Sequence, residues 1–308
     1  MTALRHTVLI STLAVMLSVG ATTDRASGST APASDQRNGR IAYQAYPNGF
    51  PEIYTISRNG DGRKRLTHNQ TFDSAPAWSP DGKRIAFMFY DGNDMELYVI
   101  DADGSDVQAI TDDNISQYHP TWSPSGLRLA FVGGPAGEDF DLFTMRLDGG
   151  GLRQLTDNNR TELHPDWSPI GNRIAFDVVG VLDPDIFTIK ADGSGLQKVT
   201  HNRTLDQDPS FSPSGRQIAY TACNQKDECQ VFTKPISGGK RRQLTYNRAA
   251  HYGPTWSPNG QRIAYQQDGE RGSDLFSKRI DGNDRRRITH SPAFTEENPD
   301  WAVRPTVR

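Results

Sequence analysis

The chain repeats one short phrase along its whole length. The copy at 164–176 reads HPDWSPIGNRIAF, and the same pattern returns at 75–87, 119–131, 208–220 and 253–265, with a shortened copy, NPDWAV, from 298. Successive copies place their aromatic residue 44 or 45 residues apart, at Trp78, Trp122, Trp167, Phe211, Trp256 and Trp301. A nearly constant period of this length is typical of propellers and solenoids, so the repeat constrains the fold more than any other feature.

Each repeat contains four short segments with the character of strands. After the Pro-x-Trp segment and a Ser-Pro-x-Gly turn come runs such as 85–87, 96–100 and 108–111. They are rich in β-branched and aromatic residues and bounded by Gly, Pro, Asn and Asp, which favours strands over helices. No segment after the N-terminal region keeps an apolar period of 3.6 residues. We therefore expect four antiparallel strands per repeat.

The two ends of the repeat region complement each other. The first repeat begins at its second strand, GRIAYQAY, and a spare Pro-x-Trp strand lies at 299–303. Placed beside 41–43, the spare strand completes the first sheet and leaves no open edge between the ends of the array. The sequence predicts an all-β, six-bladed β-propeller with four-stranded antiparallel blades, the first of which is closed by the C-terminal strand.

The repeated phrase has a structural explanation. In turns such as Pro80-Asp81-Gly82, Pro restricts φ and Gly permits a positive φ. A large aromatic residue before such a turn is expected to fill the gap between adjacent blades. Phe211 replaces one of the tryptophans, which favours packing over chemistry that needs an indole nitrogen.

The repeats P-x-W-S-P-x-G-x-x-I-A-F, followed by D-I-F-x-I-x-A-D-G-S and L-T, resemble the propeller repeats of the TolB family. The similarity extends from Asn38 to the C-terminus. It implies a six-bladed propeller whose termini meet in one blade. It implies less about activity, because this propeller serves as a protein-binding platform, as a gating domain on serine peptidases and in some carbohydrate lyases.

The N-terminal segment indicates export. Residues 1–21 combine Arg5 and His6 with an uncharged apolar run and small residues at its end, which predicts a secretory signal peptide, with an uncleaved anchor as the alternative. Residues 22–37 read as a flexible linker, and 38–308 as the propeller. We expect a periplasmic or secreted monomer with no transmembrane segment in the mature chain. A net charge of −3 argues against a nucleic-acid partner.

Cys223 and Cys229 are the two cysteines of the chain. They flank a short loop between two expected strands, so they face each other across one hairpin. Export to an oxidising compartment favours a structural disulfide over a redox site, because the spacing is not Cys-x-x-Cys.

The position before the proline of each inner strand supplies the candidate site. Around the ring it reads Ala75, His119, His164, Asp208, Gly253 and Asn298. With residues from the preceding loops, it predicts a polar channel mouth; the candidate binding residues are Asp73, Tyr118, His119, His164, Asp208, Tyr252 and Asn298. His119, His164 and Asp208 are also a candidate divalent-metal set. The alternative is that these residues are polar because the channel contains water.

No Gly-x-Ser-x-Gly motif of a hydrolase occurs in the chain. The favoured hypothesis is an exported, non-enzymatic scaffold without a cofactor, which binds a protein or peptide at the channel mouth. Aromatic anchors for such a partner are expected among Tyr46, Phe50, Phe89, Tyr90, Phe140, Tyr118 and Tyr252. The alternative is a metal-dependent, lyase-like enzyme that acts on a carbohydrate at His119, His164 and Asp208.

Two basic runs, 240–242 and 285–287, occupy equivalent positions before the outermost strands of the last two repeats. They fit a patch for an anionic partner. They also fit edge strands that carry charge to prevent sheet-to-sheet aggregation, which is the interpretation we favour.

Overall fold

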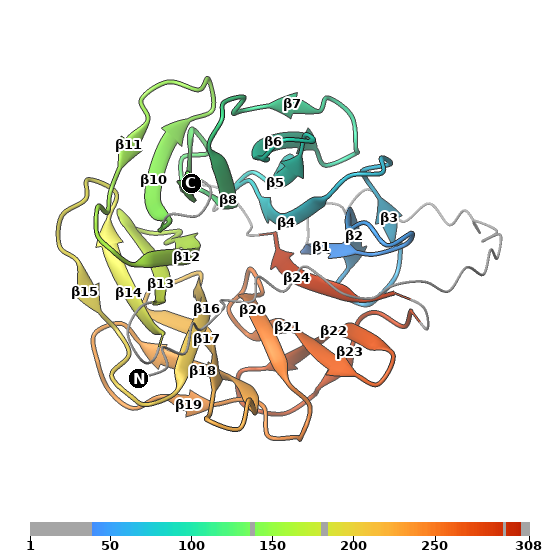
Figure 1. The fold of residues 1–308 in the computed structure, drawn as a ribbon. Helices are drawn as coiled ribbons and strands as arrows, with labels where there is room; N and C mark the ends of the chain where they lie inside the picture. Colours follow the sequence, from blue (N-terminus) through green and yellow to red (C-terminus); the bar gives the residue numbers. More distant parts are fainter. Residues whose placement is uncertain (1–38, 136–138, 180–183, 292–293, 303–308) are drawn as a thin grey trace, which may run out of the picture. The chain divides into compact units, whose positions relative to one another are not determined.

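The computed structural model describes residues 39–135, 139–179, 184–291 and 294–302. These residues form six four-stranded antiparallel sheets arranged around a common axis (Figure 1). We number the sheets as blades 1 to 6 from the N-terminus. The six-bladed propeller predicted from the repeats is therefore confirmed.

The strands fall into four classes according to their distance from the axis. The inner strands, in blade order, are β24 (Glu296–Trp301), β4 (Asp73–Trp78), β8 (Ser116–Trp122), β12 (Thr161–Trp167), β16 (Leu205–Phe211) and β20 (His251–Trp256). The second strands are β1 (Arg40–Ala45), β5 (Arg84–Tyr90), β9 (Arg128–Gly134), β13 (Arg173–Val179), β17 (Gln217–Cys223) and β21 (Arg262–Gly269). The third strands are β2 (Glu52–Ser57), β6 (Met95–Asp101), β10 (Asp141–Arg146), β14 (Asp185–Lys190), β18 (Cys229–Pro235) and β22 (Gly272–Arg279). The outer strands are β3 (Lys64–Arg65), β7 (Gln108–Ala109), β11 (Arg153–Gln154), β15 (Gln197–Lys198), β19 (Arg242–Gln243) and β23 (Arg286–Arg287).

The C-terminal strand closes the ring as predicted. β24 pairs antiparallel with β1, placing Trp301 opposite Ile41 and Asp300 opposite Ala42. The Ala302 amide donates to the Arg40 carbonyl at 3.0 Å. Residues more than 250 positions apart in the sequence thus share the first blade.

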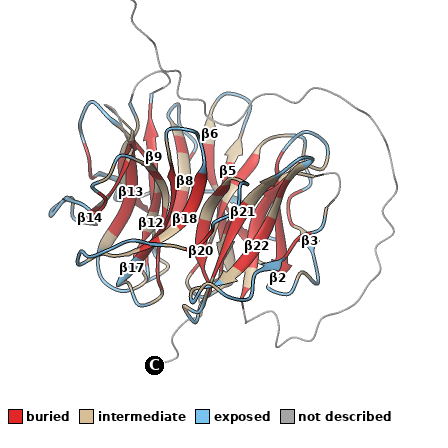
Figure 2. Cartoon of the chain, turned by 90° about the horizontal axis from the view of Figure 1, so that it is seen from below, coloured by how far each residue is buried: buried red, intermediate tan, exposed pale blue. Residues whose placement is uncertain are grey.

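The aromatic residue at the end of each inner strand packs between two blades. Trp78, for example, belongs to one buried cluster with Ile53 and Leu66 of blade 1 and Ile85 and Phe87 of blade 2. Buried residues accordingly occupy the middle of the strands, and exposed residues gather in the loops at both ends (Figure 2). Burial of such large apolar surfaces is the main force that holds the blades together.

The Ser-Pro-x-Gly turns that follow the aromatic residues have the predicted geometry. In blade 2, the Gly82 amide donates to the Ser79 carbonyl at 2.8 Å, and Gly82 has a φ of 65°. The Ser79 hydroxyl accepts the Arg84 amide at 2.9 Å, which fixes the beginning of β5. The repeated phrase therefore encodes a packing residue followed by a tight turn.

The outer strands are shorter than the sequence suggests. The run at 108–111 contributes only Gln108–Ala109 to β7. Beyond it, the Thr111 hydroxyl rather than a backbone carbonyl accepts the Leu97 amide, at 2.8 Å. A threonine side chain therefore replaces one bond of the ladder, which ends strand pairing at that residue.

Cys223 and Cys229 lie opposite each other in the β17–β18 pair and form the predicted disulfide. The predicted signal peptide at 1–21 and linker at 22–37 lie outside the described residues. Within the described ranges, no helix has the length and apolar character needed to cross a membrane.

Candidate functional site

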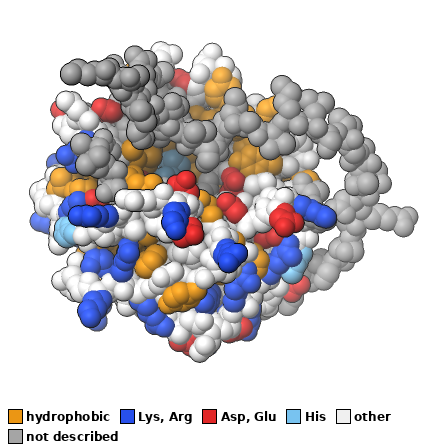
Figure 3. All heavy atoms as spheres, turned by 60° about the horizontal axis from the view of Figure 1, so that its bottom comes forward, with side chains coloured by type: hydrophobic (Ala, Val, Ile, Leu, Met, Phe, Trp, Pro, Cys, Tyr) orange, Lys and Arg blue, Asp and Glu red, His pale blue; other side chains and the backbone are white. Residues whose placement is uncertain are grey.

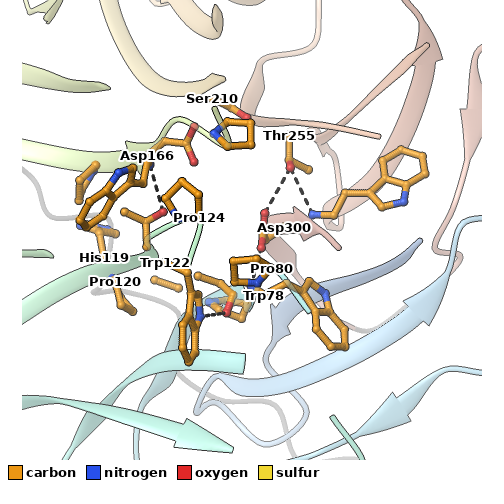
Figure 4. A pocket seen from close by; sticks show the side chains of 18 of the residues that line it. Trp78, Pro80, His119, Pro120, Trp122, Pro124, Asp166, Ser210, Thr255 and Asp300 are labelled. Atoms are coloured by element: carbon orange, nitrogen blue, oxygen red, sulfur yellow. Dashed lines mark hydrogen bonds between the residues drawn. The ribbon is translucent and has the colours of Figure 1, made fainter. Parts of the chain in front are cut away.

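The inner strands enclose a cavity of about 720 Å³ to which all six blades contribute (Figure 4). Its lining extends from the residue before each inner-strand proline to the Ser-Pro turn that follows the aromatic residue. We call this half of the channel the inner-strand end and the opposite half the inner-strand start. Leu127 and Ile170 line the cavity and are 69% and 55% exposed, so apolar side chains stand at its mouth.

The pre-proline position, the residue before each inner-strand proline, has a left-handed backbone in every blade. The φ values are 49° at Ala75, 52° at His119, 48° at His164, 54° at Asp208, 55° at Gly253 and 50° at Asn298. Gly adopts this conformation freely, and Asn, Asp and His are enriched in it among the other residues. Backbone geometry therefore explains most of the residue types that the sequence analysis interpreted as candidate ligands.

His119, His164 and Asp208 lie close together among the residues that line the cavity. The two imidazole rings lie 4.4 Å apart between centroids, so the blades do not hold them far from each other. His164 Nδ1 lies 2.9 Å from Asp177 Oδ1 and 3.5 Å from Asp208 Oδ1. Asp177, on β13, is a partner that the sequence analysis missed; it follows the apolar run Ile174-Ala175-Phe176 at the middle of a strand.

The bonds around His164 connect neighbouring blades. Asp177 Oδ1 also accepts the Asp208 amide of the next blade, at 3.2 Å. Neutral groups make the same connection between blades 1 and 2, where Gln44 Oε1 accepts the Asn298 side chain and the Ala75 amide, both at 3.0 Å. The side-chain amides of Gln44 and Asn298 thus join two blades as the Asp177 carboxylate does, but without charge. Joining neighbouring blades therefore does not require acid–base chemistry at this position.

The two imidazoles are in different electrostatic environments. Burial lowers the pKa of His164, but Asp177 and Asp208 more than offset this effect and raise it to about 9. Burial, together with His164, lowers the pKa of His119 well below its usual range. His119 Nδ1 is buried and has no hydrogen-bond partner in the part of the chain that the structure describes. His164 is therefore held as a cation and His119 as a neutral ring.

The candidate metal set does not fit a divalent ion. Nδ1 of His164 is committed to Asp177, and Asp208 Oδ2 accepts the Gly253 amide and the Thr221 hydroxyl at 3.2 and 3.0 Å. Among the described residues, no group of three or more His, Cys, Asp or Glu side chains is arranged to hold a metal ion. Metal ligation requires several convergent donors, which this cluster does not supply.

Three other candidates, Asp73, Tyr118 and Tyr252, are absent from the residues that line the cavity. Asp73 is fully buried and accepts the side chain of Asn69, in the connection between β3 and β4, at 2.7 Å. Tyr118 packs against Phe140 with 4.9 Å between ring centroids. These residues lie at the inner-strand start, whereas the cavity extends to the inner-strand end. The expected grouping of all seven residues at one mouth is therefore corrected: His119, His164, Asp208 and Asn298 line the cavity and the other three do not.

Two of the expected aromatic anchors pack against other aromatic rings. Phe89 lies 4.6 Å from Tyr98 between ring centroids, and Phe50 lies 5.7 Å from Phe72. Phe50 remains 39% exposed.

The basic runs are distributed among acidic and aromatic side chains. Arg241 lies over Phe232 at 4.4 Å and Arg285 over Phe276 at 3.9 Å. Arg287 pairs with Asp274 at 2.6 Å. Figure 3, in which the side of blades 5 and 6 comes forward, shows Lys and Arg interspersed with Asp and Glu rather than gathered in one patch. These contacts favour the interpretation of charged, protected outer edges.

Comparisons with known proteins agree with this architecture. The chain resembles TolB from Acinetobacter baumannii, with a TM-score of 0.75 and 21% identity over 86% of this chain and 67% of that one. It also resembles Kuenenia stuttgartiensis hydrazine synthase, with a TM-score of 0.74 and 16% identity over 88% of this chain and 48% of that one. A third similar structure is an oligogalacturonate lyase in complex with manganese, with a TM-score of 0.59 and 15% identity over 83% of this chain and 74% of that one.

At these identities the structural likeness shows the fold alone. No curated protein matches the chain by sequence. The family profile described as the TolB beta propeller domain matches residues 19–179 and 161–307. The chain therefore belongs to the TolB β-propeller domain family.

Proposed function

We propose that this protein is an exported, non-enzymatic scaffold that binds a segment of another protein at the inner-strand end of its channel. The main support for this proposal is the cavity of about 720 Å³, which has Leu127 and Ile170 exposed at its mouth. Concave sites lined by apolar residues and a few polar groups are where proteins bind ligands and peptide segments. Exposed apolar side chains beside such a cavity indicate a partner surface.

The arrangement of the imidazoles supports binding over catalysis. His164 is engaged with Asp177 and Asp208, and His119 has a depressed pKa. A metal-dependent lyase would need a ligand set that the described residues do not assemble. We therefore do not extend the manganese site of the lyase structure to this chain.

A capture experiment with matched variants tests the proposal. The mouth variant carries Leu127→Asp and Ile170→Asp. The control carries Leu152→Asp and Leu196→Asp, at residues that precede β11 and β15 on the outer side of the blades and are 59% and 58% exposed. The tagged proteins are crosslinked in the native cell envelope and recovered. We expect a partner that the wild type and the control retain and the mouth variant loses, because a charged mouth repels an apolar contact.

Retention of every specific partner by the mouth variant would refute the proposal. Equal loss from both variants would also count against it, because the contact would then depend on exposed apolar residues in general. Thermal melting of the three proteins identifies any variant that fails to fold.

A further inference from the structure

The residue directly before each inner-strand aromatic follows a pattern that the 44–45-residue repeat does not predict. Around the ring this pre-aromatic position reads Asp300, Ala77, Thr121, Asp166, Ser210 and Thr255. The order is Asp, a small residue and Thr, repeated twice. The ring therefore has an approximate two-fold symmetry in these side chains, and its two aspartates belong to blades on opposite sides of the channel.

Both aspartates are fixed by the next blade. Asp166 Oδ2 accepts the Phe211 amide at 2.6 Å, and Asp300 Oδ2 accepts the Trp78 amide at 2.6 Å. The Thr255 hydroxyl lies 3.3 Å from Asp300 Oδ1. The second oxygen of Asp166 has no hydrogen-bond partner within the described residues. Figure 4 shows the two aspartates on different sides of the cavity.

No counter-ion from the described lining neutralises this pair. The other ionisable lining groups are Asp81, Arg84, His119, His164 and Asp208. The Arg84 guanidinium lies over the Trp122 ring, 4.9 Å from its centroid, and His164 pairs with Asp177 and Asp208. Burial raises the pKa of Asp166 to about 8 and that of Asp300 to about 6, and Asp300 contributes to the rise at Asp166. Both carboxyls therefore lack the positive charge that would stabilise their ionised forms.

The walls around these carboxyls suit an organic cation. The prolines of the inner strands and of the Ser-Pro turns line the cavity, together with four of the five tryptophans, which are only 2–8% exposed because their rings pack between blades. A guanidinium is planar, weakly hydrated and able to donate several hydrogen bonds to carboxylates, so it suits two aspartates set among apolar walls. A divalent metal ion instead needs several converging oxygens, which the described residues do not offer.

We infer that the cavity receives the side chain of an arginine or lysine from the bound segment, between Asp166 and Asp300, while apolar residues beside that cation contact Leu127 and Ile170. This inference rests on the proposed function and specifies the chemistry of the partner. The cation supplies the charge that the two carboxyls lack. The apolar flanks distinguish a protein segment from a free polyamine.

The tryptophan indole N–H signals of the ¹⁵N-labelled full chain report directly on the cavity, since four of the five tryptophans line it. The probe is the peptide acetyl-Gly-Leu-Arg-Leu-Gly-amide, and its matched control replaces Arg with citrulline, which has the same shape without the charge. The variants are Asp166→Asn with Asp300→Asn, which keep an acceptor oxygen for the neighbouring amides. Asp192→Asn, at an exposed carboxylate in an outer turn, is the control variant.

We expect the wild type and Asp192→Asn to bind the Arg peptide at least tenfold more tightly than the citrulline peptide. In the double variant the ratio should fall to near one. Equal binding of the two peptides by the wild type, or an unchanged ratio in the double variant, would overturn the inference. So would indole shifts caused by calcium chloride alone that prevent peptide binding, which would assign the site to a metal ion.

The two proposals fail in different ways. If the Arg peptide shows no preference but capture of a partner still depends on Leu127 and Ile170, the cation inference alone is wrong. If capture is independent of the mouth, the proposed function is wrong whatever the peptide does.

Discussion

Carboxylates lie at both ends of the inner strands, but they differ in burial and in partners. At the inner-strand start, Asp206 is fully buried and accepts the Asn202 side chain and the Thr204 hydroxyl, each at 2.6 Å. At the inner-strand end, Asp166 is half-buried, accepts one backbone amide and lines the cavity. The Asp206 carboxylate is therefore surrounded by side-chain donors, whereas the Asp166 carboxylate has an oxygen without a hydrogen-bond partner among the described residues.

The difference shows how to separate structural from functional polar residues in a repeat protein. One bond of the start cluster recurs at the same repeat position: Asn69, Asn158 and Asn202 donate to Asp73, Glu162 and Asp206 at 2.7, 2.9 and 2.6 Å. The Asp-small-Thr pattern at the other end departs from the 44–45-residue period. Polar residues that recur at the same repeat position serve to build the ring. Polar residues that depart from the repeat are where we expect function.

Alanine substitutions of one carboxylate at each end of the inner strands should give the largest difference in stability. Asp206→Ala removes a fully buried acceptor and leaves the half-buried Asn202 side chain without its partner, so we expect it to lower the free energy of unfolding by about 2 kcal/mol. Asp166→Ala loses one amide bond that channel water can replace, so we expect a loss of about 1 kcal/mol. Chemical denaturation of both variants at neutral pH measures the two values.

Equal losses at the two positions would contradict the distinction between an enclosed and an available carboxylate. Asp206→Asn is the control for charge, because it keeps an acceptor oxygen. It should cost less than Asp206→Ala if unsatisfied donors, rather than the lost charge, dominate the larger effect.

The pH dependence of stability tests whether the Asp166 carboxyl lacks a positive partner in the folded chain. Burial raises the pKa of this carboxyl from an ordinary value of 3.8 to about 8. Between those values the folded state holds more protons than the unfolded state, so its stability falls as pH rises. Asp166→Asn removes this effect. From pH 5 to pH 9, we expect the wild type to lose about 1–2 kcal/mol more than the variant, with channel water screening the rest of the shift.

Denaturation curves at several pH values, compared between wild type and variant, isolate Asp166 from the other buried acids. Parallel losses in the two proteins would show that Asp166 ionises as easily in the folded chain as in the unfolded chain. The absence of a counter-ion, on which the cation inference depends, would then lose its support.

The repeat predicted the number of blades, the strand order and the closing strand because each is encoded several times or at a defined place. The six aromatics, the Ser-Pro-x-Gly turns and the spare strand at 299–303 all agree on one topology. The disulfide followed from two cysteines across one hairpin. Local signals repeated in every blade are thus readable without the structure.

The site was less readable because it depends on which way side chains point. The pre-proline residues looked like ligands, yet their left-handed backbone accounts for much of their identity. Asp177 joins His164 through pairing of β12 with β13 and a bulge before Pro165, neither of which the residue types reveal. The three-blade pattern of Asp166 and Asp300 was visible in the sequence, at the position directly before each aromatic. Similarity between repeats does not reveal it, because the pattern consists of departures from the repeat.

The smallest expected effect tests whether backbone conformation selects the pre-proline residues. Ala75 has a φ of 49°, a left-handed conformation that costs a non-glycine residue about 1–2 kcal/mol. Glycine avoids this cost but loses about 0.5–1 kcal/mol more conformational entropy on folding. Ala75→Gly should therefore stabilise the fold by about 0.5 kcal/mol. Ala77→Gly, two residues later in β4 at a position without a positive φ, should destabilise it by a similar amount. Denaturation midpoints that shift in the same direction for both variants would show that the backbone does not explain the choice of residues, and His119, His164 and Asp208 would again need a chemical explanation.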